Sequence, residues 1–192
     1  MLRNLAAAIL AAFSVTAAEA GEVADQVLAD QVKSAEDLAG AGKFIEALDA
    51  LDAAEALIWD RAPLSFRRAL WVSQPPSTFG AFVPRETNEY VVGDEMYAYV
   101  EPIGFGWRKA GDKWQMDVSF DIAVKDKTNK EVYAQKDFQK LTVESHTRSR
   151  EVMNRLTFIL TGLAPGDYVL ETTLRDAVSS KEGSFSLPFV IK

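Results

Sequence analysis

Few residues in this chain could carry out catalysis. Its 192 residues include no cysteine and a single histidine, His146. This composition rules out disulfides, thiolate nucleophiles, cysteine-ligated zinc and metal sites that need two imidazoles. If Ser145 and His146 share a strand, their side chains point to opposite faces, so they cannot form a nucleophile–base pair. We expect His146 to be a solvated residue at the end of a strand.

Acidic residues are too numerous to single out one catalytic pair, since the chain has 28 of them. A hydrolase with two close carboxylates in a pocket therefore stays an alternative. The acidic segments 93–95 and 126–131 could hold a hard cation weakly, but turns select Asp and Asn for backbone reasons. The motifs of phosphate-binding loops and serine hydrolases do not occur. We predict that the protein is not an enzyme and binds neither a metal nor a cofactor.

Aromatic residues in the middle of the chain are candidates for contact with a partner or a glycan. They comprise Tyr97, Tyr99, Phe105 and Trp107, with Arg108 beside them. Exposed rings stack on sugars or contact proteins. The alternative, which average burial favours, is that these rings fill the core.

The overall composition is that of a globular protein, with 48% hydrophobic residues, 26% charged residues and a net charge of −7. A phosphate backbone must be met by a concentrated basic surface, so we do not expect nucleic-acid binding.

The first twenty residues have the pattern of a secretory signal peptide. Arg3 precedes an apolar run, residues 5–13, and small residues stand at the −3 and −1 positions of a cleavage point between Ala20 and Gly21. No later segment is apolar over the eighteen or more residues that a membrane span needs. The cleavage point has no cysteine to receive a lipid. We predict a protein that is periplasmic or secreted after cleavage.

Residues 21–62 are predicted to form a helical hairpin. Apolar residues recur at steps of three and four on both sides of the break at 40–42. Phe44, Leu48, Leu51 and Ile58 form an apolar stripe and are the candidate interface of the hairpin.

Residues 42–48, followed by Leu51 and Ala54, resemble the second half of a tetratricopeptide repeat, although the first arm lacks the Trp, Leu-Gly and Tyr of that pattern. A single repeat cannot bury its own apolar face. We expect the hairpin to dock on the following domain or on a partner, with self-association left open.

Residues 63–192 are predicted to form a β-sandwich, because apolar and polar residues alternate and turn signals separate the runs. Nine short strands are expected, at 69–73, 79–83, 96–101, 116–124, 132–135, 138–144, 156–160, 168–174 and 185–191. Short strands without helices between them favour an antiparallel sandwich over a barrel at this length.

The last thirty residues resemble the closing hairpin of immunoglobulin-like modules in bacterial envelope proteins. The resemblance rests on Pro165-Gly166 before Tyr168, on the loop 176–183, and on Pro188-Phe189 near the end. It implies that Tyr168 fills the core and that the module binds, spaces or scaffolds.

Together these observations predict a mainly β protein, with an N-terminal helical hairpin and an antiparallel immunoglobulin-like sandwich of roughly nine strands. The predicted function is that of a non-enzymatic exported module that binds a partner or associates with the envelope. An envelope protein or a polysaccharide is the expected partner. The alternatives are a glycan-binding module that uses the middle aromatics and a carboxylate-dependent hydrolase.

Overall fold

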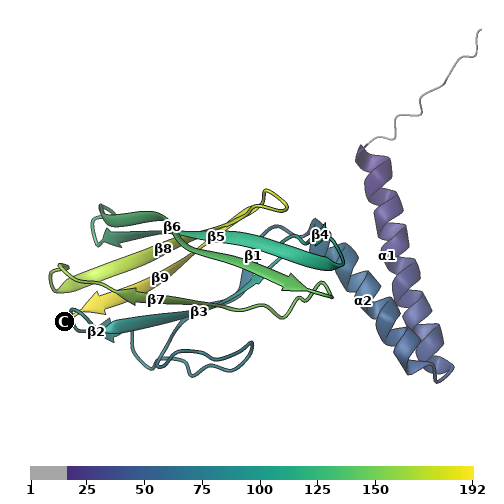
Figure 1. The fold of residues 1–192 in the computed structure, drawn as a ribbon, viewed down its shortest axis with the longest axis horizontal. Coiled ribbons are helices and arrows are strands. Elements are labelled where there is room, and N and C mark those ends of the chain that lie inside the picture. The colour runs from purple at the N-terminus through teal and green to yellow at the C-terminus, as the bar shows by residue number, and fades with distance from the viewer. Residues whose placement is uncertain (1–16) are drawn as a thin grey trace, which may run out of the picture. The chain divides into compact units, whose positions relative to one another are not determined.

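The computed structural model describes residues 17–192, with side chains from residue 21 onward (Figure 1). The chain divides into two compact units, Met1–Ile58 and Trp59–Lys192. The predicted signal peptide lies outside the described residues except for its last four, which begin the first helix. Within the described part, neither helix is long and apolar enough to cross a membrane.

The first unit is built from two helices, α1 (Ala17–Gly40) and α2 (Phe44–Arg61). The predicted break is confirmed, and Gly42 there has a φ of 74°, a left-handed conformation that glycine adopts at no steric cost. Alanines fill the interior of the hairpin: Ala35, Ala47, Ala50 and Ala54 are buried. Many of the larger apolar side chains of both helices are exposed, among them Val23, Phe44 and Leu48.

The second unit contains nine strands. They are β1 (Ser65–Val72), β2 (Glu89–Tyr90), β3 (Glu95–Ile103), β4 (Arg108–Ala110), β5 (Lys113–Asp126), β6 (Glu131–Ser145), β7 (Asn154–Ile159), β8 (Gly166–Asp176) and β9 (Glu182–Ile191). One sheet has the order β1-β3-β7. The other has the order β2-β9-β8-β5-β4, with β6 also paired to β5. All these pairs are antiparallel except β2 with β9.

The topology is immunoglobulin-like. The chain crosses between the sheets three times among the long strands, from β3 to β5, from β6 to β7 and from β7 to β8. At the third crossing, the Tyr168 hydroxyl donates a hydrogen bond of 2.9 Å to the carbonyl oxygen of Ala164. A tyrosine bonded back to the preceding backbone at this corner is a hallmark of such sandwiches. The predicted fold class is confirmed, and Tyr168 is buried as the resemblance implied.

The core fills the space between the two sheets. On β5, every second residue from Met116 to Val124 is buried, as the alternation predicts. The Trp71 ring contacts rings of both sheets. Its centroid is 6.0 Å from that of Phe158 in the same sheet and 6.1 Å from that of Phe189 in the other sheet. The sandwich is thus held by large side chains that the two sheets contribute jointly.

The beginning of the second unit is fixed by polar contacts to the backbone. The Trp59 indole N–H donates to the carbonyl oxygen of Phe105 at 2.8 Å. The Lys181 ammonium group donates to three carbonyl oxygens, those of Asp60, Ala62 and Gly104, at 3.0, 2.7 and 2.9 Å. These carbonyls include ones left without a partner by the end of α2, so Lys181 caps that helix.

Three strand predictions differ from the structure. Residues 79–83 form only isolated bridges, because the segment lies beside no partner strand over its length. The predicted strands 132–135 and 138–144 are one strand, β6, which a bulge at Asp137 interrupts. The short strands β2 and β4 were not predicted, since two or three residues carry no alternation.

Candidate functional site

A pocket lined largely by apolar side chains lies where the sandwich is open along one side. Among the described strands, β6 pairs only with β5, and β7 pairs only with β3, so both are edge strands of their sheets. The pocket has a volume of about 360 Å³. Its lining residues come from β5, β6, β7 and the segment after β7: Ile122, Val132, Tyr133, Phe138, Thr157, Phe158, Ile159, Leu160, Thr161, Gly162 and Leu163.

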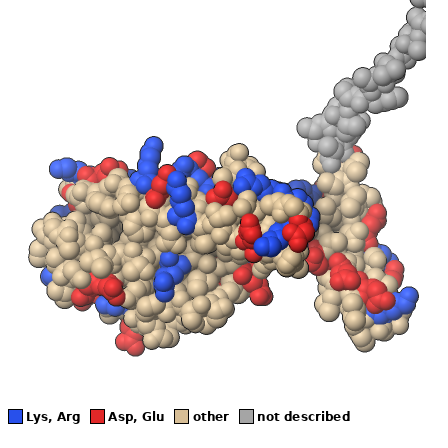
Figure 2. Space-filling model, in the orientation of Figure 1, with Lys and Arg blue, Asp and Glu red and all other residues tan. Residues whose placement is uncertain are grey.

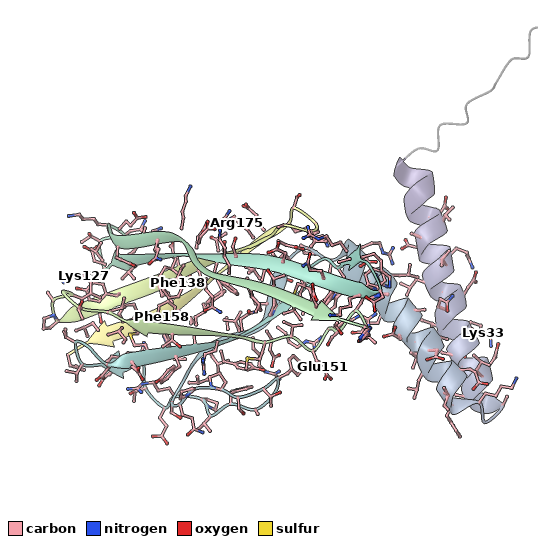
Figure 3. The ribbon with its side chains drawn as sticks, viewed as in Figure 1. Lys33, Lys127, Phe138, Glu151, Phe158 and Arg175 are labelled. Atoms are coloured by element: carbon pink, nitrogen blue, oxygen red, sulfur yellow. The ribbon has the colours of Figure 1, made fainter. Side chains whose placement is uncertain are left out.

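Two stacked phenylalanines form one wall of the pocket. Phe138 of β6 and Phe158 of β7 have ring centroids 5.1 Å apart and an angle of 7° between their planes. Figure 3 labels both rings, which reach toward each other from the two sheets. Because each ring belongs to a different sheet, this stack joins the edges and defines how far they open.

The bulge in β6 directs Phe138 into this position. Asp137 has a φ of 50°, and its backbone N–H donates to the Asp121 carboxylate at 2.7 Å. The Arg175 guanidinium then bridges Asp121 and Asp137, at 2.8 and 2.7 Å. Hydrogen bonding to Arg175 lowers the pKa of Asp121, and hydrogen bonding to Lys140 and Arg175 lowers the pKa of Asp137. Both carboxylates are thereby held ionised, and the bulge is anchored to the neighbouring strands.

Apolar side chains continue from the pocket onto its rim. Val132, Tyr133 and Ile159 are 42%, 43% and 57% exposed, respectively. Exposed apolar residues are unremarkable singly, but a contiguous group beside a pocket is typical of a binding site. The Tyr133 hydroxyl donates to the Gln135 side chain at 2.7 Å, which places a polar pair at the same rim.

The pocket is uncharged. None of the described residues that line it is acidic, basic or histidine. Thr172 pairs in register with Ile122 of the wall, so both side chains face the space between the sheets. The Thr172 hydroxyl is buried and has no hydrogen-bond partner among the described residues. The lining of the pocket therefore combines apolar side chains with the hydroxyl groups of Tyr133, Thr157 and Thr161, and it includes no charged side chain.

The middle aromatics do not form one exposed site. Tyr99 and Phe105 are buried, with 0% and 1% exposure, so the prediction that they contact a partner is wrong for these two. Tyr97 and Trp107 are half-buried and Arg108 is exposed. Phe105 is buried because its ring packs edge-on against Trp59, with centroids 5.1 Å apart.

Tyr99 is buried by a polar cluster on the outer face of the three-stranded sheet. Glu101 is 1% exposed and accepts hydrogen bonds from the Tyr99 hydroxyl at 2.6 Å and from Arg68 at 2.8 Å. The Gly80 N–H donates to the Tyr99 hydroxyl at 2.7 Å, and Phe82 stacks on the Tyr99 ring. Burial raises the pKa of Tyr99. Tyr99 therefore fastens the segment after β1 to the sheet, and Glu101 holds the Tyr99 hydroxyl in place.

The remaining candidates lie at the surface. All four residues of the hairpin stripe are exposed: Phe44 by 67%, Leu48 by 65%, Leu51 by 48% and Ile58 by 54%. His146 directly follows β6 and is exposed, which confirms the prediction of a solvated strand end. Within residues 17–192, no three His, Asp or Glu side chains gather in the manner of metal ligands.

Comparisons with known proteins find weak structural similarities. No family model matches the chain, and no curated protein matches it. A Niemann-Pick type C2 protein from Japanese carpenter ant aligns at 13% identity with a TM-score of 0.37, over 68% of this chain and 94% of that one. The sporulation control protein Spo0M from Bacillus subtilis aligns at 11% identity and 0.32, over 68% and 50%. A conjugative transposon lipoprotein from Bacteroides eggerthii aligns at 13% and 0.31, over 66% and 96%. At these values the similarities assign no function.

Proposed function

We propose that this chain is a non-catalytic binding module that takes an aliphatic group between its two sheets. The observation that carries the proposal is the uncharged pocket between β6 and β7, with apolar residues continuing onto its rim. Burial of hydrocarbon there needs no charged partner, since the gain comes from removing apolar surface from water.

The size of the pocket narrows the ligand class. Ligand pockets usually measure about 300–1,000 Å³, and this one, at about 360 Å³, lies near the lower limit. A single alkyl chain or a small apolar ring system fits such a volume, whereas a diacyl lipid would leave most of its hydrocarbon outside. Any polar head of the ligand would stay at the mouth, beside Tyr133 and Gln135.

A chain-length series tests the proposal directly. A fluorescent apolar probe, N-phenyl-1-naphthylamine, is bound to the protein and displaced by straight-chain fatty acids of increasing length. Each buried methylene contributes about 0.8 kcal/mol, which corresponds to about fourfold tighter binding per carbon until the pocket is full. Affinity that rises and then levels off supports the proposal. Absence of displacement, or affinity that does not depend on length, contradicts it.

A matched pair of variants assigns the binding to this pocket. Val132→Arg places a charge on the rim, and Val83→Arg makes the same change at an exposed valine outside the pocket; the two valines are 42% and 47% exposed. We expect at least tenfold weaker binding for the rim variant only. Equal effects of the two substitutions would assign the binding to a non-specific surface.

The export of the module is also part of the proposal, and the residue pattern before Gly21 supports it. N-terminal sequencing of the protein from a native host should begin at Gly21. Retention of residues 1–20 would contradict export and the envelope role that follows from it.

The absence of catalysis is proposed on the same grounds. The pocket lining lacks the two carboxylates that a hydrolase needs, and His146 is solvated. We expect His146→Ala to retain fold, abundance and cellular role. Loss of the cellular role with folding unchanged would instead favour the hydrolase. Burial of Tyr99 and Phe105 leaves the half-buried Tyr97 and Trp107 as the rings on which the glycan-binding alternative rests.

A further inference from the structure

The net charge of the protein is concentrated in the hairpin. Residues 21–58 contain nine acidic and two basic side chains, whereas residues 59–192 contain eighteen of each. The hairpin therefore accounts for the whole net charge of −7, and the sandwich is neutral. Acidic side chains are spread along the hairpin on the face that Figure 2 shows.

The exposed stripe of α2 has the spacing of a coiled-coil seam. Phe44, Leu48, Leu51, Glu55 and Ile58 follow one another at steps of four, three, four and three. This is the a/d pattern by which one helix packs its side chains between those of another. All five residues are exposed, and Glu55 occupies a position that is apolar in an uninterrupted seam.

A second seam on the same helix is already occupied. Ala47, Ala50 and Ala54 have the same alternation of three and four, and all three are buried in the hairpin. The two seams lie on adjacent faces of α2, since at 3.6 residues per turn their mean directions differ by roughly 90°. The helix thus has one seam that is buried in the hairpin and a second seam that is exposed.

The net negative charge of the hairpin discriminates between the possible partners of the exposed seam. One candidate partner is the same seam in a second copy of the protein. Parallel pairing of the two seams would set Glu55 against Glu55. Antiparallel pairing centred on Leu51 would bury Glu55 against Leu48. Each hairpin would also carry a net charge of −7, and like charges brought together repel. An anionic lipid surface is repelled for the same reason. A basic amphipathic helix is attracted, and it can place a Lys or Arg opposite Glu55.

We propose that the seam formed by Phe44, Leu48, Leu51, Glu55 and Ile58 binds an amphipathic helix of a partner protein that carries a basic residue at the position facing Glu55. The apolar residues provide burial, and Glu55 selects the partner and its register. This is the role that a polar residue at a single a position has in coiled coils.

The test uses the full chain and two synthetic peptides of three heptads. Both peptides have leucine at the a and d positions and lysine on the flanking positions, and they differ at one central a position, which is lysine in one and glutamate in the other. Fluorescence anisotropy should show at least tenfold tighter binding of the lysine peptide, and the binding should weaken with salt. Glu55→Lys should reverse the preference. Non-specific attraction of a basic peptide to an acidic protein would not reverse in this way, so an unchanged preference overturns the proposal.

Apolar contact is tested with a matched pair. Leu51→Gln changes the seam and Val91→Gln changes an exposed valine of the sandwich; the two residues are 48% and 60% exposed. We expect at least tenfold weaker peptide binding for Leu51→Gln alone, with both melting temperatures close to that of the parent protein. Equal effects of the two variants overturn the proposal. A dimer in sedimentation that Leu51→Gln dissociates would also overturn it, because the seam would then bind a second copy.

Discussion

The hairpin and the sandwich bury different kinds of side chain. In the hairpin, small alanines are inside, and large apolar residues such as Phe44 and Leu48 are exposed. In the sandwich, large residues such as Phe120 and Leu156 are fully buried between the sheets. The hairpin is also acidic, whereas the sandwich is neutral.

This difference bears on how each region gains stability. Burial of apolar surface is the main favourable term in folding, and alanine contributes little of it. The sandwich buries most of its large apolar residues between its two sheets. The hairpin leaves much of its potential burial unused, which is the expected state of a surface that gains its remaining contacts from a partner.

A pair of leucine truncations should show this contrast most strongly. Leu156→Ala removes a fully buried side chain of the sandwich and should cost about 2–5 kcal/mol in the free energy of unfolding. Leu51→Ala removes a side chain that is 48% exposed and should change that free energy by less than about 0.5 kcal/mol. Urea unfolding measures both. A large loss for Leu51→Ala would mean that the stripe is packed within the protein, and the contrast would fail.

The contribution of the capped end of α2 to stability can be measured by substitution of Lys181. Lys181→Met removes three hydrogen bonds from a charged group to carbonyl oxygens, and we expect a loss of about 1–3 kcal/mol. Lys113→Met is the control, because Lys113 forms an exposed ion pair with Glu144 at 3.1 Å, and such pairs contribute about 0–1 kcal/mol. Similar losses for the two variants, measured by thermal unfolding, would show that the carbonyls are satisfied without Lys181.

The smallest effect is expected at Tyr90, a buried residue of the sandwich whose hydroxyl has no hydrogen-bond partner among the described residues. Tyr90→Phe should be neutral or stabilising by up to about 1 kcal/mol at neutral pH, since an unpaired buried hydroxyl is removed.

The same substitution should change the response to alkaline pH. Burial raises the pKa of Tyr90 from 10.0 to about 12. Above pH 10 the unfolded chain ionises while the folded protein keeps the proton, so stability is lost as the pH rises through this window. The Phe variant should lose less stability there than the parent protein. Parallel losses in urea titrations between pH 10 and 12 would contradict this account.

Much of the fold could be predicted because its signals are local. The alternation along 116–124 gives the inward face of β5, and the glycines at 40 and 42 mark the helix break. The segment 79–83 shows where local signals fail. Phe82 is half-buried there because it stacks on Tyr99, whereas Val83 is exposed, and no strand pairs with the segment over its length. A short apolar run therefore does not show whether its residues lie in a strand or in a loop.

The pocket could not be predicted, because its lining residues are far apart in the sequence. No local sequence pattern shows that they come together. Ile122, Phe138 and Phe158 come from three strands, and each alone is an ordinary core residue. What makes the pocket is that β6 and β7 are both edge strands on the same side of the sandwich. The middle aromatics were the more visible signal, and Tyr99 and Phe105 proved to be buried.

The bulge at Asp137 has a consequence for solubility as well. β6 is a fifteen-residue strand with one side unpaired within the described sheet, and such an edge invites the addition of strands from other molecules. The bulge interrupts the regular row of backbone donors and acceptors at its middle, and the ion pair of Lys140 with Asp137 at 3.0 Å adds charge there. A flat strand from another copy cannot pair along the whole edge. The edge of the sandwich beside the pocket is thereby protected against aggregation into a continuous sheet.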